Sequence, residues 1–115
     1  MTLAKRIAAK RQEKPRSSFE VVQWGEGDSP CVLYFTPVSA RDIDQVSRKH
    51  PTLLRDTTLP GMVDMIIRKC EDESGDPVFT LEDKPILMGE QVTTLTSIFS
   101  AIFDSGAEDE DQEKN

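Results

Sequence analysis

The sequence predicts an α+β fold, in which an N-terminal β-hairpin packs on three to four short helices between charged, flexible termini. Three observations predict it. Two runs rich in β-branched and aromatic residues, 19–24 and 31–36, flank a turn-like GEGDSP segment. Apolar residues after position 58 recur with the period of a helix. Charge of opposite sign collects at the two ends of the chain.

The charge divides the chain into three parts. All 115 residues together carry a formal net charge of −7. Residues 1–16 hold six Lys or Arg and one Glu, a net of +5, and residues 104–115 hold six Asp or Glu and one Lys, a net of −5. We therefore expect a basic N-terminal arm over 1–16, with the composition of a short helix, a single folded domain over 17–103, and an acidic disordered tail over 104–115.

The hairpin is apolar on both of its faces. Phe19 and Val21 share one face of the first strand, while Val22 and Trp24 share the other. Pro37 ends the second strand, because proline cannot donate a hydrogen bond to a strand ladder. One face is therefore expected to pack on helices, and the other is a candidate partner surface.

Capping residues and apolar spacing predict the first two helices of the folded domain. Ser39 and Asp42 form a capping-box pair at the start of the first. Thr58 caps the second, in which Pro60 lies in the first turn. The apolar stripe of this second helix consists of Leu59, Met62, Val63, Ile66, Ile67 and Cys70.

The remaining helices are expected after position 80. Thr80 and Asp83 form a second pair of the capping-box type, and Pro85 limits the segment to one or two helical turns ending at Gly89. A last amphipathic helix is expected over 90–103.

Composition argues against several classes of function. The acidic balance disfavours nucleic acid as a partner, and no apolar run reaches membrane-spanning length. Cys31 and Cys70 are expected to be small core residues in a reducing cytoplasm. His50 is expected to be a solvated or helix-dipole-stabilising residue near a helix end. No catalytic, metal or cofactor motif is visible, so we expect a non-enzymatic protein without cofactors that binds other proteins.

Apolar side chains outside the expected core are the candidate partner-binding residues. Methionine on a helix surface gives an adaptable apolar contact. The candidates are Val22, Trp24, Tyr34, Met65, Met88, Ile98 and Phe103.

Two segments carry a family resemblance. YFTPVSARDIDQV over 34–46 and MIIRKCEDESGDPVFTLEDKPILMGE over 65–90 resemble the tail assembly chaperones of long-tailed (siphovirus-type) bacteriophages. The resemblance implies a non-enzymatic protein of the host cytoplasm that binds and solubilises the tape measure protein, helps to recruit tail tube subunits, and is absent from the mature virion. In many relatives a programmed frameshift yields a second, longer product.

The residues alone leave alternatives open. A small acidic adaptor or inhibitor that binds a host protein is the main alternative. A small enzyme with a shallow site is a third interpretation. The basic arm has three interpretations: a solvated terminus, a weak nucleic-acid contact, or an electrostatic partner for an acidic protein. Pairing of the oppositely charged arms between copies would give self-association into a head-to-tail array.

Overall fold

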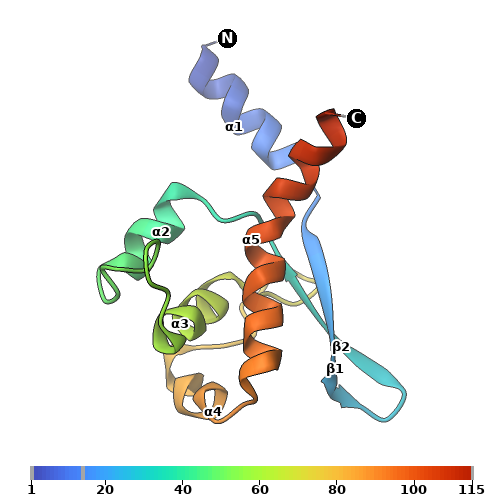
Figure 1. Ribbon diagram of the computed structural model, residues 1–115. Helices are drawn as coiled ribbons and strands as arrows, with labels where there is room; N and C mark the ends of the chain where they lie inside the picture. Colours follow the sequence, from blue (N-terminus) through green and yellow to red (C-terminus); the bar gives the residue numbers. More distant parts are fainter. Residues whose placement is uncertain (1, 14, 115) are drawn as a thin grey trace.

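The computed structural model describes residues 2–13 and 15–114, with side chains described as far as Ser105 (Figure 1). It is a mixed fold of one two-stranded antiparallel hairpin and several helices, which confirms the predicted α+β class. Its elements are α1 (Leu3–Glu13), β1 (Ser17–Glu26), β2 (Ser29–Phe35), α2 (Ala40–Ser47), α3 (Leu59–Lys69), the 3-10 helix η1 (Leu81–Asp83), α4 (Lys84–Met88) and α5 (Val92–Lys114).

The hairpin is longer than predicted and irregular near its tip. The pairing of β1 with β2 is regular from Ser17↔Phe35 to Val21↔Cys31 and is then shifted before Glu26 pairs with Ser29. Gly27 in the turn has a φ of +55°, a conformation that glycine adopts without steric cost. Gly25 lies where the strands approach closely, because a Cβ atom there would be 2.6 Å from the carbonyl oxygen of Ser29.

The core lies where one face of the hairpin meets α3 and α5. α3 packs beside α5, and α5 also contacts β1 (Figure 1). The predicted stripe of α3 is confirmed except at its first residue, since Leu59 is 40% exposed. The core side chains are Val21, Leu33, Phe35, Met62, Val63, Ile66, Ile67, Cys70, Leu87, Leu95, Ile98 and Ile102.

The helix starts follow the predicted capping residues. The Ser39 hydroxyl accepts the Asp42 N–H at 3.2 Å, and the Asp42 carboxylate accepts the Ser39 N–H at 2.9 Å. Thr58 accepts the Gly61 N–H at 3.2 Å through its hydroxyl. These two caps are confirmed. Their side chains satisfy backbone donors that the first helical turn leaves without a helical partner.

The segment around Pro85 is short and broken, as predicted. The Asp83 carboxylate accepts the Thr80 N–H at 2.8 Å. One turn of 3-10 helix then passes into α4, which has Pro85 in its first turn and ends at Gly89. Proline is tolerated there because the first N–H groups of a helix have no partner within it.

The two ends of the chain are both helical in backbone. α1 forms within the predicted basic arm, and none of its residues is buried. Lys14 lies outside the described residues. The backbone of α5 continues to Lys114, past the predicted end of the last helix at position 103. Extending an existing helix avoids the cost of nucleation, so polar residues can continue it. Among residues 2–13 and 15–114, no helix has the length and apolar character needed to cross a bilayer.

Candidate partner-binding groove

An apolar groove of about 310 Å³ lies between the hairpin and α4. Its walls come from β1 and β2, from the extended segment before η1, from α4, and from the residue pair that precedes α5. The lining side chains are Trp24, Cys31, Val32, Leu33, Val78, Phe79, Ile86, Leu87 and Glu90. Elements that are far apart in the sequence therefore build one apolar surface.

Trp24 is held in a fixed orientation at the wall of this groove. Its indole N–H donates to Glu90 Oε1 at 3.0 Å. Its ring meets the ring of Phe79 edge-on, with centroids 6.0 Å apart and an interplanar angle of 82°. Edge-to-face aromatic pairs and a satisfied indole N–H are both stabilising, so the groove is preformed rather than induced by a partner.

The rim of the groove exposes large apolar side chains. Ile86 is 72% exposed and Val78 is 37% exposed. Leu81 in η1 and Met88 in α4, which are close to Val78 and Ile86 in the sequence, are also exposed. Fully burying one such side chain is worth about 1.5–3 kcal/mol, so a partner that covers this rim gains binding free energy.

The charged groups on this side of the molecule are mostly carboxylates. η1 carries Glu82 and Asp83, and Glu90 lies in the groove. Lys84 is the one cation within η1 and α4, and its ammonium lies 2.8 Å from Asp64 Oδ1. The groove is therefore an apolar hollow beside negative charge, which favours an apolar ligand that also carries cations.

The predicted partner-binding residues divide into three groups. Trp24 lines the groove, and Met88 is exposed on α4. Val22 is 76% exposed and lines a second hollow, between β1 and the start of α5. Met65 and Ile98 have no exposed surface, so their prediction as partner contacts is wrong.

The two remaining candidates are half-buried against their own chain. The guanidinium of Arg16 lies 5.0 Å from the centre of the Tyr34 ring. The ring of Phe103 packs on that of Phe99, with centroids 4.7 Å apart. Neither lines the groove.

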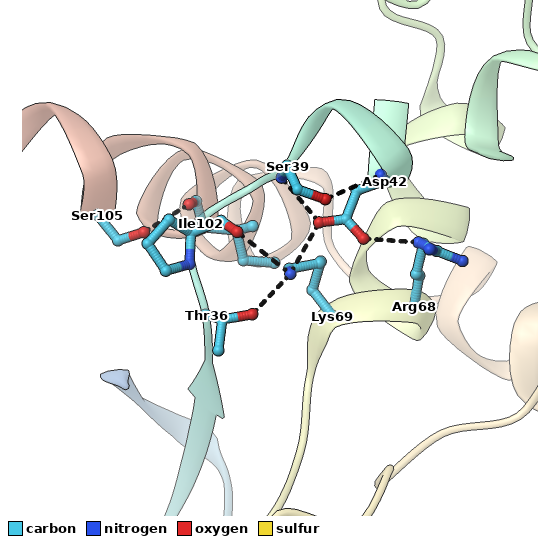
Figure 2. A network of polar contacts seen from close by, with 8 residues as sticks. Thr36, Ser39, Asp42, Arg68, Lys69, Ile102 and Ser105 are labelled. Atoms are coloured by element: carbon cyan, nitrogen blue, oxygen red, sulfur yellow. Dashed lines mark hydrogen bonds and ion pairs between the residues drawn. The ribbon is translucent and has the colours of Figure 1, made fainter. Parts of the chain in front are cut away.

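A buried ion-pair network fixes α2 to α3 (Figure 2). Asp42 Oδ2 accepts from Lys69 Nζ at 2.9 Å, and Asp42 Oδ1 accepts from Arg68 Nε at 2.8 Å. The Lys69 ammonium also donates to Thr36 Oγ1 at 2.8 Å and to the carbonyl oxygen of Pro37. Arg68 and Lys69 lie in the last turn of α3. Their partner is a carboxylate from another helix, a contact that the sequence did not reveal.

A second buried carboxylate corrects the prediction for His50. His50 Nε2 lies 2.7 Å from Asp64 Oδ2, and the histidine side chain is 15% exposed. His50 is therefore not a solvated residue. Burial acts to raise the pKa of Asp64, but the hydrogen bonds and charges of Lys84 and His50 lower it overall. Asp64 interrupts the apolar run of α3, and that interruption was the signal for a buried polar contact.

A clamp at Arg16 fixes the chain between α1 and β1. The Arg16 guanidinium donates to Glu71 Oε1 at 3.0 Å and to the carbonyl oxygens of Asp72 and Glu73 at 2.9 and 2.6 Å. The backbone of Glu71 in turn pairs with that of Tyr34. The clamp therefore holds the start of β1 against the segment that follows α3.

The dependence of the free energy of unfolding on pH in the acid range is expected to depend on Asp42. Burial acts to raise the pKa of this carboxyl, but the Ser39 N–H, Lys69 and Arg68 together lower it from 3.8 to about 2. A lowered pKa contributes stability above the unfolded value and loses it as the pH falls through the folded value. We expect the free energy of unfolding of the wild type to approach that of Asp42→Asn as the pH falls from 3.8 toward about 2. Urea titrations of both proteins at several pH values measure this, and a constant difference over that window contradicts it.

Within the described part of the chain, no three His, Cys, Asp or Glu side chains are placed so that they could hold a metal ion. Comparison of the sequence and the structure with protein-family models, curated proteins and solved structures finds no match in any of the three. The groove is therefore interpreted from its own residues and from the sequence resemblance.

Proposed function

We propose that this protein is a phage tail assembly chaperone whose groove binds apolar helical segments of the tape measure protein. The observation that carries the proposal is the preformed groove, with Trp24 fixed at its wall and Ile86 exposed at its rim. An amphipathic helix buries its apolar stripe in a groove of this kind. The segments that resemble tail assembly chaperones supply the identity of the client.

The surrounding charge suits the same role. A protein that covers the apolar stripe of a long client must itself stay soluble, and net charge away from zero favours solubility. The chain carries a net charge of −7. Coating of the client in the host cytoplasm, recruitment of tail tube subunits and absence from the mature virion complete the proposal, which requires neither catalysis nor a cofactor.

Co-expression with the tape measure protein of the same phage tests the proposal. We expect the wild type to increase the soluble fraction of the client and Ile86→Asp to abolish the increase. The substitution removes apolar contact area and places a carboxylate in the groove, and a loss of about 1.4 kcal/mol already weakens binding tenfold. Soluble and pelleted client, separated by centrifugation, give the measurement.

Leu54→Asp is the matched control. Leu54 is 73% exposed, similar to Ile86, but lies between α2 and α3 and does not line the groove. It should support client solubility as well as the wild type does. The proposal fails if the wild type leaves the client insoluble, and the assignment to the groove fails if Ile86→Asp and Leu54→Asp behave alike.

A further inference from the structure

α1 is an exposed helix near the N-terminal end of the chain. None of its residues is buried, and Leu3 and Ile7 are 62% and 54% exposed. These two side chains are four residues apart and so lie on one face, which Lys10 and Arg11 continue over the next turn. An isolated helix of this length is marginal in water, so α1 gains stability from a surface that covers this face.

The groove offers the complementary surface. Its rim presents the apolar side chains of Val78 and Ile86, and Glu82 and Glu90 supply carboxylates close by in the sequence. The apolar face of α1 matches the rim, and its cations match the carboxylates. Opposite charges at the edge of an interface speed association and set its register.

The two surfaces lie at opposite ends of the molecule. In Figure 1, α1 is at the top, whereas α4 and the tip of the hairpin are at the bottom. β1 runs between the two ends, and the clamp at Arg16 holds the chain immediately before β1. α1 therefore cannot reach the groove of its own chain while β1 and the clamp are intact.

We propose that α1 of one copy docks in the groove of a second copy. The contact joins two different surfaces, so a docked pair keeps one free groove on one copy and one free α1 on the other, and further copies add head to tail. This differs from pairing between oppositely charged arms, because the acceptor is the groove. The contact itself does not depend on the proposed function; where that function holds, α1 and the client compete for one site.

Sedimentation velocity of the full chain over a range of concentrations at low salt tests the docking. The wild type should form a growing series of species that shrinks as salt is added. Ile7→Asp alone and Ile86→Asp alone should each be monomeric. Gln12→Asp, which places the same residue in α1 away from the face of Ile7, and Leu54→Asp in the body should associate like the wild type.

Mixing the two monomeric variants gives the decisive result. Ile7→Asp retains an intact groove and Ile86→Asp retains an intact α1, so an equimolar mixture should form a heterodimer and grow no further. A monomeric wild type, unchanged association of either variant, or a mixture that stays monomeric would each overturn the docking.

Trp24 provides a direct probe of the groove, because it is the single tryptophan of the chain. Adding a peptide of residues 2–13 to the Ile7→Asp protein should change the tryptophan fluorescence in a saturable way, and the same peptide with Ile7→Asp should not. Equal responses to both peptides contradict the docking. Client solubility separates the two proposals, since Ile7→Asp should still support the client whereas Ile86→Asp should not.

Discussion

Asp42→Ala is expected to lower the free energy of unfolding by about 3–5 kcal/mol, because it leaves a buried cation without its partner. The Lys69 side chain is 8% exposed, and its ammonium would keep only the Thr36 hydroxyl and the Pro37 carbonyl oxygen. The substitution also removes half of the capping box with Ser39 and the contact with Arg68. Urea unfolding monitored by circular dichroism measures the loss.

Asp44→Ala is the control for this substitution. Asp44 lies on the same helix and pairs with Arg48 at 3.3 Å, but its side chain is 65% exposed. Exposed ion pairs of this kind contribute about 0.3–0.5 kcal/mol, so Asp44→Ala should unfold close to the wild type. If the two substitutions cost the same, the Asp42 network does not fix α2 to α3 as described.

Met65→Ala is expected to destabilise the fold by about 2–5 kcal/mol, since it opens a cavity in a fully buried site. Met65 has no exposed surface and packs with Val46 and Leu53 in the part of the core next to α2. The midpoint of thermal unfolding and the urea midpoint should both fall. A change below about 1 kcal/mol would mean that the surrounding side chains collapse into the space.

Met88→Ala is the matched control, because it makes the same methionine-to-alanine change at an exposed position. Met88 is 41% exposed, so its truncation should change the free energy of unfolding by about 0.5 kcal/mol or less. We expect its effect on partner binding instead, because Met88 is one of the exposed apolar side chains near the groove. A stability loss at Met88 as large as that at Met65 would contradict this assignment.

Features that depend on neighbouring residues could be predicted from the sequence. The caps at Ser39 and Thr58 and the stripe of α3 follow from residues three or four positions apart, whose geometry a helix determines. The hairpin follows from two apolar runs around Gly25 and Gly27. Local chemistry of this kind specifies elements and their approximate bounds.

Features that join distant residues could not be predicted in the same way. The groove brings Trp24, Phe79 and Glu90 together, and no periodic pattern links residues so far apart. Met65 was predicted to reach a partner because it lies beside the expected stripe, but α3 is buried around most of its circumference between its neighbours. How much of a helix is covered depends on tertiary packing, which periodicity within one helix does not report.

The two cysteines differ in burial. Cys70 is 1% exposed, and burial raises the pKa of its thiol to about 12. Cys31 is half-buried in the groove wall, and burial raises its pKa as well. Only a thiolate reacts readily, so alkylation of Cys70 requires a transient opening of the core. The rate of its alkylation therefore measures how often the core opens. Cys31 lines the groove, so we expect its alkylation to slow when a ligand occupies the groove. The two thiols would then report on two different events, opening of the core at Cys70 and occupancy of the groove at Cys31.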